Sequence, residues 1–197
     1  MLFHETPLAG AYVIDLEKRG DDRGFFARAF CKREFAEYNL PTDFVQANNS
    51  LSADEGTLRG MHFQLAPDAE TKLVRCIRGA FWDCIIDLRP ESVTYCEWFG
   101  EELSAENRRM MLVPRGFAHG FISLTADTEA FYLVDSYYSS EQERGVRWND
   151  PRFNIQWPLE PKVLSDRDAE QRDFDPKYHL AQPSHQTVIK TPGETST

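Results

Sequence analysis

Eight short runs rich in Val, Ile, Leu, Phe and Tyr follow one another between residues 44 and 138, with Gly, Pro, Asp and Asn between them. They recur at a spacing of about 8 to 14 residues, which is typical of consecutive strands joined by turns. The runs are FVQANNSLS, TLRGMHFQ, KLVRCIRG, AFWDCIIDLRP, TYCEWFGEEL, RMMLVPRG, HGFISLTAD and TEAFYLVDSYY. This rhythm favours an all-β sandwich, jelly roll or barrel over βαβ units.

The run FWDCIIDL indicates what kind of interior such a fold has. Alternate residues of a strand share one face, so Phe81, Asp83, Ile85 and Asp87 lie opposite a second set that is also mostly apolar. Both faces are therefore expected to be covered. Acidic side chains on an inward face predict a barrel with a partly polar interior, as a ligand-holding jelly roll requires.

Helices contribute little to the predicted fold. The best helical segment is CKREFAEYN, residues 31–39, and SAENRR, residues 104–109, is expected to form one short turn. We expect one cupin-like domain over residues 1–180. Residues 181–197 are low in apolar side chains and predict a polar, flexible tail.

Charge and cysteine content restrict the binding partners and the cellular compartment that are expected for this protein. The 197 residues carry a net charge of −10 and have a pI near 5.0, whereas nucleic acids and anionic lipid surfaces attract excess Lys and Arg. We find no signal peptide and no membrane span, so we expect a cytoplasmic protein. The four cysteines form no C-x-x-C pair and are expected to be packed thiols: Cys31, Cys76, Cys84 and Cys96.

Two stretches, GTLRGMHFQ and PRGFAHG, each place one histidine beside glycines: His62 and His119. Their spacing resembles the frame of metal-binding cupins, the double-stranded β-helix proteins. Gln64 stands at the position of the second histidine ligand and Lys72 at that of the glutamate. Because a protonated lysine repels a cation, we expect no metal. The pocket is instead suited to binding anions and moving protons.

A more specific resemblance extends from about Asp21 to Asp168. The segments DDRGFFARAF, FVQANNS, GTLRGMHFQ, KLVRCIRG, PRGFAHGF, FYLVDSYY, W-N-D-P and LSDRD occur in this order. In order and spacing they resemble the dTDP-4-dehydrorhamnose 3,5-epimerase family. The resemblance implies a jelly-roll cupin that forms a homodimer, with active sites completed by a strand from the partner, and without metal or organic cofactor. The implied substrate is a nucleoside-diphosphate 4-keto-6-deoxyhexose, whose C3 and C5 hydrogens are acidified by the C4 ketone.

The same resemblance implies roles for four residues. His62 matches the general base, and Asp168 matches the carboxylate that orients it. Lys72 is the candidate for stabilising the enolate oxygen, and Tyr132 matches the general acid.

Further residues match substrate-binding positions. The arginines suit a diphosphate, because a guanidinium donates two parallel hydrogen bonds, while Tyr138 or Phe26 is suited to stack on the base. Arg23 is expected to come from the partner subunit. Of Tyr137 and Tyr138, which are expected to alternate across a strand, at most one should face the cavity. The substrate-binding candidates are Arg23, Phe26, Arg28, Gln46, Asn48, Arg59, His119, Tyr138, Glu143 and Arg167.

Arg28 departs from the family pattern. The thymidine-linked enzymes usually carry F-F-x-E where this chain has Phe25, Phe26, Ala27 and Arg28. A guanidinium donates hydrogen bonds and cannot accept the N3 hydrogen of thymine, which leaves CDP open as the nucleotide. It is equally open whether C3 alone is inverted. Two further function classes stay open, namely a metal-dependent cupin enzyme and a sugar-binding cupin without catalysis.

Overall fold

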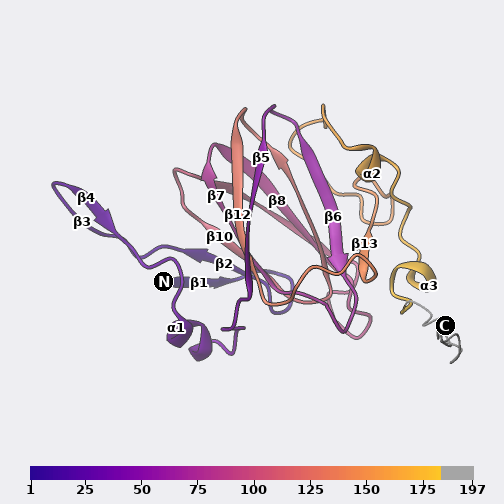
Figure 1. Cartoon of the computed structure of the whole chain (residues 1–197), viewed down its shortest axis with the longest axis horizontal. Coiled ribbons are helices and arrows are strands. Elements are labelled where there is room, and N and C mark those ends of the chain that lie inside the picture. The colour runs from indigo at the N-terminus through magenta and orange to yellow at the C-terminus, as the bar shows by residue number, and fades with distance from the viewer. Residues whose placement is uncertain (183–197) are drawn as a thin grey trace, which may run out of the picture.

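A computed structural model describes residues 1–182, and nearly all of its regular structure is antiparallel β (Figure 1). A six-stranded sheet has the order β1-β2-β10-β7-β12-β5, and it faces a five-stranded sheet with the order β13-β6-β11-β8-β9. The strands of the first sheet are β1 (Leu2–Glu5), β2 (Tyr12–Asp15), β10 (Met110–Val113), β7 (Lys72–Arg78), β12 (Thr128–Val134) and β5 (Gln46–Ser52). Those of the second are β13 (Glu143–Gly145), β6 (Leu58–Gln64), β11 (Phe117–Ser123), β8 (Ala80–Asp87) and β9 (Trp98–Ser104). Two facing antiparallel sheets of this kind confirm the predicted jelly roll.

The main core lies between the two sheets. It is built from the inward side chains of both, which alternate with outward residues along each strand. On β8, Phe81 and Ile85 join this core, whereas Cys84 and Ile86 pack on the opposite face of the sheet under the C-terminal segment. Both faces of β8 are therefore covered, as its sequence predicts.

Three short helices lie outside the sandwich: α1 (Lys32–Glu37), α2 (Asp166–Ala169) and α3 (Pro176–His179). Helix α1 falls within the predicted helical segment and buries Phe35 against the outer face of the six-stranded sheet. Helix α2 contacts β6 and is the one that positions the site. The Ser165 side chain caps it by accepting a hydrogen bond from the Asp168 backbone N–H at 3.1 Å.

A hairpin formed by β3 (Arg19–Asp21) and β4 (Gly24–Phe26) projects away from the sandwich as an arm (Figure 1). Its six strand residues are all exposed. Phe26, at 71% exposure, is among the most exposed large apolar side chains in the described part of the chain. An arm of this kind leaves apolar surface that its own protomer does not cover.

The structure confirms some of the other predictions made from the sequence and contradicts one of them. All eight β-rich runs contain a strand, and residues 105–107 form a turn, as expected. The last run ends as a strand at Val134, however, so the prediction that Tyr137 and Tyr138 alternate on a strand is wrong. Nearly all of the predicted tail, residues 183–197, lies outside the described residues.

The four cysteines are free thiols, as predicted, and two of them are fully buried in the core. None of the helices in residues 1–182 is long and apolar enough to cross a membrane.

Candidate active site

Two adjoining hollows open between the sheets, with volumes of about 290 and 300 Å³. Both are lined by His62, Lys72 and Tyr132, so these three side chains lie where the hollows meet. The first is completed by Ser50, Arg59, His119, Gly120, Phe121, Ser165, Arg167 and Asp168. The second is completed by Gln46, Asn48, Phe63, Gln64, Glu70, Tyr138 and Glu143. The structure thus brings all four predicted catalytic residues into one pocket.

The two histidines of the sequence motifs are cross-strand partners, because His119 on β11 lies directly opposite His62 on β6. Paired residues of neighbouring strands present their side chains on the same face of the sheet. Beside them, a Cβ added at Gly60 would lie 2.5 Å from the Gly120 Cα, and Gly60 has a φ of +130°. Glycine is therefore required where the two strands approach most closely.

His62 is hydrogen-bonded to a carboxylate that lies 106 residues further along the chain. Its Nε2 lies 2.6 Å from Asp168 Oδ1 on helix α2. Within residues 1–182 its Nδ1 has no hydrogen-bond partner. Burial alone would raise the pKa of the Asp168 carboxyl, but the hydrogen bond from His62 brings that pKa below its usual value. The ionised carboxylate holds the proton on Nε2 and leaves the Nδ1 lone pair free to accept one.

His119 has a similar pair, since its Nε2 lies 2.7 Å from Asp83 Oδ1. Here burial dominates and raises the pKa of the Asp83 carboxyl, which is inaccessible to solvent. The His119 side chain is 10% exposed, whereas that of His62 is 30% exposed. His62 is therefore better suited as the base than His119, because it is more accessible and the pKa of its partner carboxyl is lowered, whereas that of Asp83 is raised.

Lys72 and Tyr132 reach the pocket from the opposite sheet. On β7 and β12, Tyr132 pairs with Val74, and Lys72 lies two residues from Val74 on the same strand face. Val74 belongs to the core between the sheets, so both side chains point inward. Burial raises the pKa of the Tyr132 phenol, and the Glu70 carboxylate raises it further. Tyr132 is therefore protonated at neutral pH and can donate a proton.

Most predicted binding residues surround this centre. Gln46 and Asn48 on β5 are joined by a 2.8 Å hydrogen bond. At the rim, Glu143 accepts a hydrogen bond from the Tyr138 hydroxyl at 2.6 Å and forms an ion pair with Arg167 at 2.5 Å. These three side chains border the pocket next to His62 without being buried in it.

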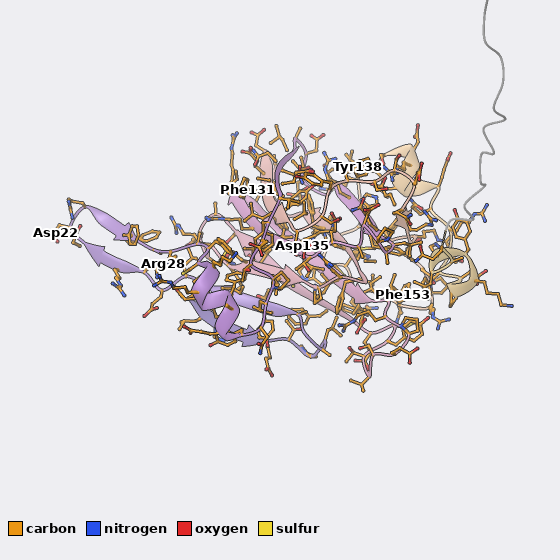
Figure 2. All side chains as sticks on the ribbon, turned by 60° about the horizontal axis from the view of Figure 1, so that its bottom comes forward. Asp22, Arg28, Phe131, Asp135, Tyr138 and Phe153 are labelled. Atoms are coloured by element: carbon orange, nitrogen blue, oxygen red, sulfur yellow. The ribbon has the colours of Figure 1, made fainter. Side chains whose placement is uncertain are left out.

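Three predicted residues lie elsewhere in the protomer: Arg23, Phe26 and Arg28 line neither hollow. They belong to the arm and its base, and Figure 2 shows Asp22 at the tip of the arm and Arg28 at its base well away from Tyr138 at the pocket rim. Arg23 pairs with Asp21 at 2.5 Å, and Arg28 pairs with Glu34 on α1 at 2.7 Å. A single protomer therefore does not bring the arm to its own pocket.

Sequence reasoning missed the role of Glu70. Its carboxylate pairs with the Lys72 ammonium inside the second hollow. The available signal was the spacing of two residues, which keeps side chains on one face of an extended chain. Glu70 precedes the start of β7, however, so no strand pattern pointed to it.

The donor set does not fit a metal ion. In the described residues, no group of three or more His, Cys, Asp or Glu side chains converges in a way that could hold one. The Lys72 ammonium lines the same hollow as both histidines, where it would repel a cation. That the protein works without a metal stays a prediction.

A larger open hollow, about 880 Å³, adjoins the same ends of β5, β7 and β12, where Val45, Thr71 and Asp135 line it, but it contains none of the predicted site residues. Its two arginines, Arg89 and Arg115, are already paired with Asp87 and Asp135. Its size alone does not indicate a site, because its charged side chains are already paired within the described chain; the remaining carboxylate, Asp43, pairs with Lys32.

Fold and pocket together define a cupin-type jelly roll whose cavity holds paired acid and base side chains. A sequence model of the family described as dTDP-4-dehydrorhamnose 3,5-epimerase matches residues 5–175. A protein of that name from Sinorhizobium fredii is 46% identical over 172 residues, which cover 87% of this chain and 88% of the relative. The chain belongs to the dTDP-4-dehydrorhamnose 3,5-epimerase family.

Solved structures agree with this assignment. The dTDP-4-dehydrorhamnose 3,5-epimerase of Bacillus anthracis, with TDP and PPi bound, has a TM-score of 0.85 and 43% identity; the match covers 88% of this chain and 99% of that one. ChmJ, a 3'-monoepimerase from Streptomyces bikiniensis in complex with dTDP-quinovose, has a TM-score of 0.80 and 31% identity over 86% of each chain.

Proposed function

We propose that this protein inverts C3 and C5 of a dTDP-linked 4-keto-6-deoxyhexose by removing and returning protons, without a metal or organic cofactor. The observation that carries the proposal is the arrangement of one cavity. His62 enters from the five-stranded sheet with Asp168 behind it on α2, and Tyr132 and Lys72 enter from the six-stranded sheet. A base and an acid on opposite walls suit a reaction that takes a proton from one face and returns it to the other.

In the first step His62 Nδ1 accepts the proton at C3 or C5. The electrons of the broken C–H bond move into the ring and onto the C4 oxygen, which gives an enolate. Asp168 stabilises the imidazolium that forms, through its hydrogen bond to Nε2. The Lys72 ammonium stabilises the enolate oxygen, because a fixed charge in a shielded cavity acts most strongly where new charge develops.

In the second step the Tyr132 hydroxyl donates its proton to the same carbon from the opposite face. The electrons return from the enolate oxygen to that carbon and re-form the C4 ketone. The phenolate and the imidazolium then exchange protons with solvent, which restores the enzyme. Inversion at the second carbon repeats the same two steps.

The nucleotide is proposed to be dTDP and not CDP. The CDP hypothesis requires that Arg28 contact the nucleotide base, but Arg28 forms an ion pair with Glu34 of its own chain. In addition, the relatives whose names state a nucleotide are thymidine-linked. Inversion of both carbons is proposed because the family that matches is that of the 3,5-epimerases, whereas the 3'-monoepimerase is only 31% identical.

The direct test is solvent-deuterium incorporation by the purified protein in the presence of EDTA, with dTDP- and CDP-linked 4-keto-6-deoxyglucose as substrates. We expect deuterium at both C3 and C5 of the dTDP sugar and epimerised product. Deuterium at C3 alone would indicate a monoepimerase. Faster reaction of the CDP sugar would support the hypothesis that Arg28 contacts the nucleotide base. If neither sugar exchanges deuterium, the proposed function is wrong. Activity that is lost in EDTA and restored by a metal ion would favour a metal-dependent cupin enzyme.

We also propose that the arm completes the pocket of a second copy in a homodimer, with Arg23 on the substrate's diphosphate. The exposed Phe26 and the absence of Arg23 from its own pocket support this arrangement. Mixing Arg23→Ala chains with His62→Ala chains should restore activity that neither has alone, because some sites then combine an intact arm with an intact base. With independent segregation, activity should approach about a quarter of wild type. If the protein is monomeric by light scattering, or activity does not recover after verified subunit exchange, the shared site is wrong.

A sugar-binding protein without catalysis is the alternative function, and the pocket supports it less well. Binding alone gives no reason for an ionised carboxylate behind His62 or for a partly buried phenol facing it from the other sheet.

A further inference from the structure

Glu70 carries a carboxylate that the proposed reaction does not use. It lies in the second hollow, and both it and its partner Lys72 have side chains only 11% exposed. One oxygen, Oε1, accepts a hydrogen bond from Lys72 Nζ. The other, Oε2, accepts one from Gln64 Nε2 at 3.3 Å. The carboxylate is thus held on one side by the lysine and on the other by an amide.

Gln64 is itself tightly anchored. Its Oε1 accepts a hydrogen bond from the Ser139 backbone N–H at 2.6 Å. The two hydrogens of its Nε2 are shared between Glu70 and the carbonyls of Asp68 at 2.9 Å and Tyr137 at 3.2 Å. The position where metal-binding cupins have a second histidine is therefore occupied here by an amide that fixes two loops and orients Glu70.

Glu70 also acts on the proposed acid. After burial, its charge is the main influence that raises the pKa of the Tyr132 phenol. Arg59 on β6 opposes it, and Glu143 on β13 acts in the same direction. Other charged or titratable groups that line the same hollows are Lys72, His62, His119, Arg167, Asp168 and Tyr138.

We propose that Glu70 is a positioning residue of the epimerisation: it holds the Lys72 ammonium in the pocket, and its negative charge in the same hollow opposes formation of the Tyr132 phenolate. This inference rests on the proposed function. A lysine has a long flexible stem, so its ammonium needs an anchor to stay beside a developing oxyanion. A negative charge near a phenol disfavours phenolate, which has no proton to give.

A purely structural role explains this arrangement less well. Replacing a buried ion pair by apolar side chains is often neutral or stabilising, so stability alone does not call for one. This pair, moreover, lies in the wall of the cavity that holds His62 and Tyr132 and not in the apolar core.

The first test measures Tyr132 without substrate, by NMR titration of isotope-labelled tyrosine in the resting protein. Glu70→Gln should shift the titration midpoint of Tyr132 to lower pH, because it removes the charge and keeps the shape. Glu129→Gln is the matched control, since Glu129 lies on the same strand but three residues from Tyr132, on its other face. Glu70→Asp keeps the charge and should leave the midpoint close to wild type. An unchanged midpoint in Glu70→Gln, or an equal shift in Glu70→Asp, would overturn the inference.

The second test uses activity. Glu70→Gln should lower kcat by about tenfold to a hundredfold with little change in KM, because displacement of a catalytic group costs on the order of 10²-fold. In a Lys72→Met background the same change should lower kcat much less, since Glu70 acts largely through Lys72. Full additivity of the two losses would contradict the inference. If wild type has no activity, the proposed function fails, and the tyrosine titration still decides whether Glu70 controls Tyr132.

Discussion

His62→Ala is expected to abolish incorporation of solvent deuterium at both C3 and C5, together with epimerisation. Among the described side chains of the pocket, the imidazole combines access from the cavity with an ionised carboxylate at 2.6 Å. Loss of a general base lowers the rate by about 10² to 10⁴-fold. The measurement is the rate of deuterium incorporation at each carbon, followed by NMR.

The control for this variant is His4→Ala. His4 lies on β1, where it pairs with Asp15 at 3.2 Å and lines neither hollow, so its loss should leave the exchange rates unchanged. Exchange at the wild-type rate in His62→Ala would transfer the role of base to another residue, of which His119 is the first candidate.

Tyr132→Phe is expected to separate the two halves of the reaction. Without the hydroxyl, net epimerisation should fall by about 10² to 10³-fold, because the enolate loses its proton donor on the far face. His62 can still remove a proton and return a deuteron from its own side, so part of the exchange with retained configuration should persist. Measuring label and configuration at the same carbon distinguishes the two outcomes.

The pH profile provides a second measurement on this variant. Because burial and then Glu70 raise the pKa of the Tyr132 phenol, the acid form persists until the pH passes that raised value. The alkaline limb of wild-type epimerisation should therefore lie above the usual pKa of a tyrosine, and Tyr132→Phe should lose that limb. Tyr178→Phe, at an exposed position on α3, should behave as wild type. Equal loss of exchange and epimerisation in Tyr132→Phe would contradict its role as acid.

The dimer proposal and the Glu70 inference concern different parts of the site. Arg23 is proposed to act on the diphosphate from a second copy, whereas Glu70 acts on two side chains within its own pocket. A failure of subunit complementation would leave the tyrosine titration untouched. The two ideas can therefore be tested independently.

The strands could be predicted from the sequence because a period of two is a local signal. Each of the eight β-rich runs contains a strand, and the alternation in FWDCIIDL indicated that both faces of β8 are covered. That local signal does not extend past the end of a strand. Tyr137 and Tyr138 were misplaced for this reason, since β12 ends at Val134 and the chain continues as a loop.

The sequence by itself determined the strand content, the two histidine motifs and, through ordered motifs, the family. Only the tertiary structure decided which of these side chains meet. The 106 residues between His62 and Asp168, the register of His119 against His62 and the closeness of Glu70 to Tyr132 all follow from how the sheets close. Strand pairing between distant segments depends on the whole topology, because no local period specifies which strand becomes a neighbour.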